Sequence, residues 1–232
     1  MKSIIEKNIE TIKKQVRSAA ERSGQREEDI KIIAVTKNVP IDRILMAIGA
    51  GIRDIGENKA QEITKKHNEL KNEDDICWHF VGHLQRNKVR QIIDFVDCIQ
   101  SVDSLRLLEE INTRALENNR VQGILLQVNM AKEAAKHGFM SDDVLGVLER
   151  IGDFGHVRVK GLMNIAPFFD DPQKARSVFA KMKALFDQLK EGGIPGVELH
   201  YLSMGMTNDF EVAIESGANM VRIGTGIFGA AK

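Results

Sequence analysis

The sequence predicts a single (β/α)8 barrel of the TIM type with one extra helix at its N-terminal end. Strand-like apolar runs and helical patterns alternate strictly along the chain, and eight such units in 232 residues match a barrel near its minimum size. This alternation indicates parallel strands joined by helical crossovers. A doubly wound open sheet produces the same local pattern, so closure of the sheet is an expectation for the structure to test.

The predicted strands are short runs rich in β-branched and other apolar residues, bounded by turn-forming residues. In chain order they cover residues 32–37, 51–55, 78–81, 98–102, 124–129, 157–163, 198–202 and 220–223. Helical patterns fill the intervals, and several of them open with Asp, Ser or Pro, as helices commonly do. They cover residues 41–50, 57–70, 84–95, 104–119, 142–151, 173–191 and 209–216.

The first 24 residues predict an amphipathic helix that covers the outside or the base of the barrel. Charged residues alternate there with Ile5, Ile9, Ile12 and Val16, a pattern unlike that of a signal peptide. No apolar stretch approaches the length needed to span a bilayer. We therefore expect one domain over residues 1–232 and no membrane partner.

Composition favours a protein that binds small molecules in the cytoplasm. Thirty-three basic residues balance thirty-three acidic ones, so no global field attracts nucleic acid or an anionic membrane surface. The two cysteines, Cys77 and Cys98, show neither CxxC nor zinc spacing, and a chain of this size without a signal peptide needs no disulfides. A reducing, cytoplasmic environment is the expected location.

Lys37 ends the first predicted strand, at the edge where parallel α/β proteins bind ligands. An amine held in partly apolar surroundings loses solvation of its charged form, which lowers its pKa and makes it a candidate Schiff-base nucleophile. A solvated lysine that simply ends a strand is the competing interpretation, and position and residue type alone favour it. The rest of the chain must decide between the two.

The C-terminal segment contains a GxGxxG pattern in Gly224, Gly226 and Gly229. A dinucleotide site needs a further helix, a second strand and an acidic residue about 20 positions downstream, but only three residues follow Gly229. The local chemistry remains, because glycine N–H groups can approach a phosphate closely and Thr225 adds a hydroxyl.

The loop after the seventh predicted strand supplies Ser203, and barrels commonly build a phosphate site from the loops after strands seven and eight. Closure of the barrel sets strand eight beside strand one, so the phosphate loop is expected near Lys37. A reactive amine beside a phosphate site is the combination that pyridoxal 5′-phosphate requires.

Six segments together resemble the pyridoxal phosphate homeostasis proteins, a family similar to the barrel domain of alanine racemase without its second domain. They are Ala34-Val35-Thr36-Lys37, Gly56-Glu57-Asn58, Trp78-His79-Phe80-Val81-Gly82-His83-Leu84-Gln85, Gly161-Leu162-Met163, Leu202-Ser203-Met204-Gly205-Met206 and Val221-Arg222-Ile223-Gly224-Thr225. They span nearly the whole chain in the family's order. The resemblance implies one alanine-racemase-N-terminal-like domain over residues 1–232.

The resemblance also implies a site for pyridoxal 5′-phosphate. It implies that Lys37 holds the cofactor as an internal aldimine and that Asn58 lines it. It further assigns the phosphate group to Ser203, Gly224 and Thr225, and it sets Arg222 near the pyridine nitrogen.

Arg222 leads us to expect cofactor binding with little or no turnover, and no catalytic residue. A guanidinium only donates hydrogen bonds, so a ring nitrogen that faces it stays unprotonated and is a weak electron sink. The second base of the racemase comes from the domain missing here, and Tyr201, the only tyrosine, lies in a predicted strand. The alternatives are a racemase-like enzyme and, less favoured, a Schiff-base aldolase that uses Lys160, although Arg158 shares that strand face.

The remaining expectations concern metals and partners. His79 and His83 have i, i+4 spacing but straddle a strand end without an HExxH pattern, so we expect no metal site and place His83 near the cofactor mouth. A monomer is expected, because the racemase dimer depends partly on the missing domain. Recipient apo-enzymes that need the cofactor are conceivable partners, but storage, delivery and scavenging leave no mark in the sequence.

Overall fold

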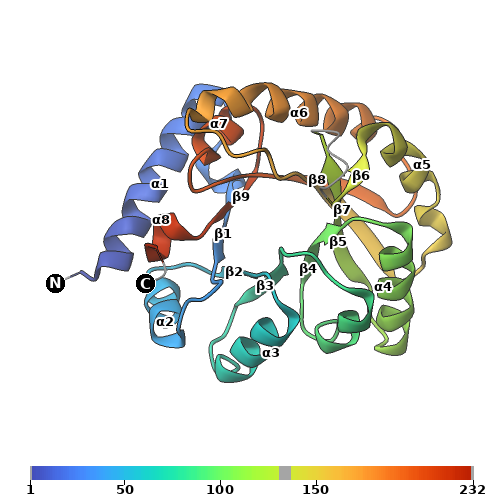
Figure 1. Ribbon diagram of the computed structural model, residues 1–232, viewed down its shortest axis with the longest axis horizontal. Coiled ribbons are helices and arrows are strands. Elements are labelled where there is room, and N and C mark those ends of the chain that lie inside the picture. Colours follow the sequence, from blue (N-terminus) through green and yellow to red (C-terminus); the bar gives the residue numbers. More distant parts are fainter. Residues whose placement is uncertain (1, 131–136, 231–232) are drawn as a thin grey trace.

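Eight parallel strands form a closed barrel in the computed structural model, which describes residues 2–130 and 137–230 (Figure 1). Pairing of the fourth strand with the fifth, and of the first with the last, completes the ring. Around the barrel the strands are β1 (Lys31–Val35), β2 (Asp54–Glu57), β3 (Cys77–Phe80), β4 (Cys98–Val102), β5 (Gln122–Asn129), β7 (Val157–Met163), β8 (Val197–Met206) and β9 (Met220–Ile223). A two-residue strand, β6 (Phe139–Met140), pairs with the end of β5. Closure confirms the predicted barrel and excludes the open sheet.

Helices surround the barrel on its outer side (Figure 1). They are α1 (Ile4–Ser23), α2 (Ile41–Gly49), α3 (Ala60–Glu69), α4 (Leu105–Glu117), α5 (Val144–Glu149), α6 (Arg176–Lys190), α7 (Phe210–Glu215) and α8 (Thr225–Phe228). Their inner faces carry fully buried side chains such as Ile63, Leu108 and Phe179, which form the main hydrophobic core against the strands. Among the described residues, no helix combines the length and apolar character needed to cross a bilayer.

The second strand lies later in the chain than predicted. Residues 51–55 were expected to form it, but β2 covers Asp54–Glu57 and pairs in register with β3. The misleading signal came from Ile52, which is buried in the turn after α2, where its N–H donates to the carbonyl of Ala47 at 3.0 Å. Glu57, which was predicted to begin a helix, instead ends β2, and its side chain is fully buried.

Three further boundaries differ from prediction. The first strand ends at Val35 rather than at residue 37, and the helix predicted over residues 57–70 begins only at Ala60. The helix predicted over residues 84–95 is a short 3-10 helix, Arg86–Gln91. Apolar residues three apart fit a 3-10 turn as well as an α-helix, so periodicity alone did not separate the two.

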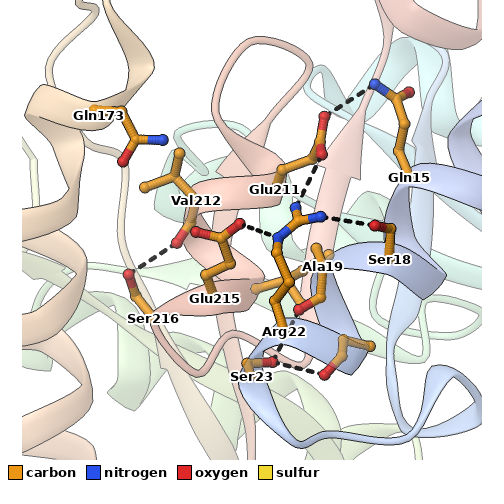
Figure 2. A network of polar contacts seen from close by, with 12 residues as sticks. Gln15, Ser18, Ala19, Arg22, Ser23, Gln173, Glu211, Val212, Glu215 and Ser216 are labelled. Atoms are coloured by element: carbon orange, nitrogen blue, oxygen red, sulfur yellow. Dashed lines mark hydrogen bonds and ion pairs between the residues drawn. The ribbon is translucent and has the colours of Figure 1, made fainter.

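Helix α1 packs on the outer side of the barrel against α7 and α8. Ser3 and Glu6 form a capping box at its start, and Gly24 ends it in the left-handed conformation at φ 71°. Figure 2 shows Arg22 between two carboxylates of α7, with Nε 2.7 Å from Glu215 and Nη2 3.2 Å from Glu211. The predicted extra helix therefore covers the outside of the barrel and not its base.

The barrel interior contains a second, smaller apolar cluster. Ile33, Cys98, Leu125, Met163 and Met220 form it, and Tyr201 packs against it. The interior also holds a line of buried polar side chains, which leads from the carboxyl ends of the strands toward their starts.

Candidate functional site

The ends of β1, β2 and β9 lie side by side at one mouth of the barrel. Val35 pairs with Gly56, and Ala34 pairs with Ile223, so the segments that follow these three strands begin next to one another. The predicted neighbourhood of strand one and the last strand is confirmed by this pairing. Lys37 lies two residues beyond β1 in a turn, and its side chain is exposed, in contrast to the partly apolar surroundings expected from sequence.

A buried ion pair between Glu57 and Lys66 fixes the backbone that follows the neighbouring strands β1 and β2. The Glu57 carboxylate accepts hydrogen bonds from Lys66 Nζ at 2.5 Å, Thr36 Oγ1 at 3.3 Å and the Asn58 N–H at 2.7 Å. Lys66 also donates to the carbonyl of Thr36 at 2.7 Å. Thr36 and Glu57 are fully buried and Lys66 nearly so. This pair therefore holds the chain immediately before Lys37 and at Asn58.

Asn58 is held closely by the loop after β3. A Cβ atom at Gly82 would lie 2.3 Å from the Asn58 carbonyl oxygen, a contact that only glycine avoids. The side-chain oxygen of Asn58 is buried and accepts no hydrogen bond from the residues that the structure describes. A buried acceptor without a partner costs free energy, so this oxygen is suited to a donor from a ligand.

The loop between β9 and α8 supplies backbone N–H groups next to β1. A Cβ atom at Gly224 would lie 3.3 Å from the carbonyl oxygen of Val35. Within the described ranges, the N–H groups of Gly224 and Thr225 have no hydrogen-bond partner, whereas the Gly226 N–H donates to Thr207 Oγ1 at 3.2 Å. Successive N–H groups with a nearby hydroxyl form a suitable site for an anion such as a phosphate.

Arg222 and Ser203 lie inside the barrel wall. Arg222 Nη1 donates to Ser203 Oγ at 2.6 Å, and Nη2 donates to the carbonyl of Asn164 at 2.8 Å. Burial lowers the pKa of Arg222 to about 10, opposed by the charge of Asp209, so the guanidinium stays charged at neutral pH. Ser203 is fully buried, and its hydroxyl is engaged within the barrel. Ser203 thus lies within β8 and not, as predicted, in the loop after that strand, whereas Thr207, which follows β8, contacts the glycine loop directly.

The Ser203–Arg222 contact is one end of a buried hydrogen-bond chain. Ser203 Oγ donates to Gln100 Oε1 at 2.7 Å, Gln100 Nε2 lies 3.0 Å from His79 Nδ1, and His79 Nε2 lies 3.0 Å from Asp54 Oδ1. Because guanidinium only donates and carboxylate only accepts, every link has one direction. His79 is consequently neutral in this arrangement, with its proton on Nε2.

Asp54 ends the chain near the start of β2. Burial acts to raise the pKa of Asp54, but the hydrogen bond from His79, together with the Lys31 ammonium at 3.3 Å, holds that pKa below its ordinary value. This carboxylate is therefore ionised at neutral pH and serves as the terminal acceptor.

The other residues considered from sequence lie away from this edge. Lys160 lies within β7, before its carboxyl end, and a Cβ atom at Gly123 would be 3.1 Å from its Cε. Arg158 faces Glu198 at 3.5 Å, and Tyr201 belongs to the interior of the barrel, as expected.

Sequence reasoning overlooked Glu57, Lys66 and Gln100 as parts of the site. Only Lys66 left a signal, since it falls on the buried face of α3 with Ala60 and Ile63. A lysine at an apolar helix position indicates a buried partner.

Comparison with known families matches residues 7–232 of the chain to the model described as alanine racemase, N-terminal domain. The pyridoxal phosphate homeostasis protein of Aquifex aeolicus is 39% identical over 224 residues, covering 97% of both chains. The protein of the same name from Haemophilus influenzae is 34% identical over 227 residues, covering 97% of this chain and 95% of the relative.

Solved structures show the same similarity. PipY of Synechococcus elongatus, whose structure has PLP bound, superposes with a TM-score of 0.80 at 35% identity, covering 91% of this chain and 100% of PipY. An alanine racemase from Streptomyces coelicolor superposes with a TM-score of 0.72 at 17% identity, covering 94% of this chain but 57% of the racemase. The likeness to the racemase concerns the fold alone.

Proposed function

The chain belongs to the alanine racemase N-terminal domain family and, within it, to the pyridoxal phosphate homeostasis proteins, and from this premise we propose that it binds pyridoxal 5′-phosphate and serves cellular homeostasis of that cofactor. The observation that carries the proposal is the pairing of β1 with β9, which sets the turn of Lys37 next to the loop of Gly224 and Thr225. The bound PLP of the related PipY structure supports the same ligand.

The residues present fit this cofactor. In the proposal, the Lys37 amine condenses with the cofactor's aldehyde, with loss of water. The unpartnered N–H groups of Gly224 and Thr225 bind the phosphate, with the Thr225 hydroxyl as a further donor. Asn58 offers its unpartnered side-chain oxygen to the ring substituents. In our proposal Ser203 does not contact the phosphate directly, because its hydroxyl already accepts a hydrogen bond from Arg222 and donates one to Gln100.

Arg222 supports a binding role with little or no catalytic turnover. When bound, the cofactor supplies an aldehyde and an electron-withdrawing ring. A charged guanidinium opposite the ring nitrogen can only donate to it, so the nitrogen remains unprotonated and withdraws electrons weakly. Tyr201 is held in the barrel interior, in a cluster with apolar neighbours, and is poorly suited to act as a second base.

We also propose a single-domain monomer in the cytoplasm that exchanges the cofactor with dependent apo-enzymes. The two unpaired thiols, Cys77 and Cys98, are in keeping with a reducing compartment. Sedimentation of the purified chain tests the monomer. Transfer of the cofactor to an added apo-enzyme, compared with transfer from an equal concentration of free cofactor, tests delivery.

Absorption spectroscopy of the purified protein tests the central claim. We expect a visible imine band that survives dialysis and disappears in Lys37→Ala. Borohydride reduction should fix the cofactor's mass on the peptide that carries Lys37. Lys160→Ala is the matched control, since it removes another strand lysine of the same barrel, and it should retain the band.

Two results contradict the proposal. Loss of the band in Lys160→Ala together with its retention in Lys37→Ala would move the attachment point to β7. Amino-acid racemisation by the loaded protein at ordinary enzyme rates, about 1–10³ per second, would overturn the non-catalytic role while leaving cofactor binding intact.

A further inference from the structure

A second cluster of polar side chains lies at the barrel mouth, on the segments that follow β3, β4 and β5. His83 Nδ1 lies 3.0 Å and His137 Nδ1 lies 3.5 Å from the same oxygen of Asp103, Oδ2. His83 follows β3, Asp103 directly follows β4, and His137 lies between β5 and β6. In the ring, β4 and β5 are across from β1 and β9 (Figure 1), whereas His83, which follows β3, lines a pocket together with Asn58.

The backbone beside both histidines of the cluster is anchored by contacts within the barrel. Gly82, next to His83, packs against Asn58 too closely to admit a Cβ atom. The carbonyl of His137 accepts a hydrogen bond from Gln127 Nε2 at 3.0 Å, which ties it to β5. The Asp103 side chain is only 9% exposed, so its carboxylate is held in place while the two imidazoles remain open to solvent.

We propose that His83, Asp103 and His137 bind a divalent transition-metal ion of the zinc class through the two Nδ1 atoms and one carboxylate oxygen. Ligand atoms about 2.1 Å from such an ion lie about 3.0–3.4 Å from one another, close to the two separations observed. Two imidazoles and a carboxylate are ligands that zinc, nickel, cobalt and iron accept. The sequence expectation of no metal site weighed only His79 with His83, and His79 belongs to the buried hydrogen-bond chain.

Ion binding requires one small movement. The rings of His83 and His137 are stacked, with centroids 3.8 Å apart and planes within 12°, so one ion cannot lie in both ring planes. Rotation of the His137 ring, which is 58% exposed, brings its lone pair toward the ion. Three protein ligands leave further coordination positions open to water or to a molecule in the barrel mouth.

A different trio is less suited to a metal. Asp54, Cys77 and His79 also lie close together, but His79 and Asp54 are committed to the buried hydrogen-bond chain. Burial raises the pKa of the Cys77 thiol, which disfavours the thiolate that a metal needs. This trio supplies the competing location that the experiment must separate.

Isothermal titration of the chelator-treated protein with Zn²⁺, followed by Co²⁺ absorption spectroscopy, tests the site without reference to bound cofactor. We expect one Zn²⁺ per chain, with affinity at least tenfold weaker in His137→Ala and in Asp103→Asn. His200→Ala is the matched control, because His200 is an exposed histidine 3.9 Å from Glu198, and it should bind as the unaltered protein does. Unchanged circular dichroism verifies that each variant is folded.

Three outcomes overturn the proposal. Equal affinity in the unaltered protein, His137→Ala and Asp103→Asn removes the site. So does an equal loss in His200→Ala, which indicates binding by surface histidines in general. A thiolate-to-cobalt charge-transfer band that disappears in Cys77→Ser moves the ion to the interior trio. The proposed function stands or falls separately, because the imine band on Lys37 needs none of these three ligands.

Discussion

Replacement of Lys66 by methionine removes one partner of the buried ion pair while keeping most of the side-chain volume. Glu57 then stays buried without its countercharge, and the carbonyl of Thr36 keeps only the N–H of Val39 as a donor. The side chains of Lys66 and Glu57 are 6% and 1% exposed, so water cannot readily replace the lost contacts. Lys183→Met is the matched control, since Lys183 forms a solvent-exposed ion pair with Asp187.

The expected costs of the two substitutions differ several-fold. Breaking a buried pair by removing one partner costs about 3–5 kcal/mol, whereas an exposed pair contributes about 0–1 kcal/mol. In chains of this length, one kcal/mol lowers the melting temperature by about 2–4 °C. We therefore expect a fall of about 6–20 °C for Lys66→Met and at most about 4 °C for Lys183→Met.

Thermal and urea unfolding, followed by circular dichroism, measure Lys66→Met, Lys183→Met, Glu57→Gln and the double variant Lys66→Met with Glu57→Gln. The neutral glutamine removes the unpaired charge and can still accept from the Asn58 N–H, so the double variant should recover part of the loss. A Lys66→Met variant no less stable than Lys183→Met would refute the reasoning. A double variant whose destabilisation equals the sum of the two single ones would show that the charges are not coupled.

Three further outcomes are expected. Gly82→Ala sets a Cβ atom 2.3 Å from the Asn58 carbonyl and should destabilise the fold by about 1–3 kcal/mol, whereas Gly146→Ala, which meets no atom within 4 Å in helix α5, should stabilise it by about 0.4–1 kcal/mol in the same melts. The pKa of Asp54 is lower in the folded protein than in the unfolded chain, so ionised Asp54 stabilises the fold above the ordinary carboxyl pKa of about 3.9, and this stabilisation is lost as the pH falls through the folded-state pKa. Asp54→Asn should therefore make the free energy of unfolding less dependent on pH on the acid side. An unchanged slope contradicts the lowered pKa of Asp54. Leu108→Ala leaves a cavity at a fully buried position of helix α4 and should cost about 2–5 kcal/mol in urea unfolding.

The fold was predictable because hydrophobic periodicity is a local property. Alternating strand and helix signals predicted parallel strands joined by helices, and closure of the ring in the structure brings Gly224, after the last strand, near the turn of Lys37. Strand and helix boundaries were predicted wrongly where an apolar residue is buried outside a strand or a charged residue is buried within one. Ile52 is buried in a turn and imitated a strand residue, while Glu57 is charged yet completes one, because its partner Lys66 lies in the next helix.

The site was only partly predictable because several of its contacts join strands that are distant in sequence. The nearness of Lys37 to the loop of Gly224 follows from strand order, whereas Asn58 was assigned only through the family resemblance. The link from Ser203 to Gln100 spans 103 residues and crosses the barrel interior, which no local pattern encodes. Likewise, His137 meets His83 only because β3, β4 and β5 are neighbours in the ring.

The single donor-to-acceptor direction of the buried hydrogen-bond chain limits which substitutions its members can accept during evolution. Gln100 presents its Nε2 donor to His79 and its Oε1 acceptor to Ser203, so it joins two halves of fixed polarity. A glutamate there would keep the acceptor for Ser203 but turn a lone pair toward His79, which would have to adopt its other tautomer and turn a lone pair toward Asp54. Substitutions along this line are therefore expected to occur in matched sets, from the base of the barrel to Arg222, and rarely one at a time.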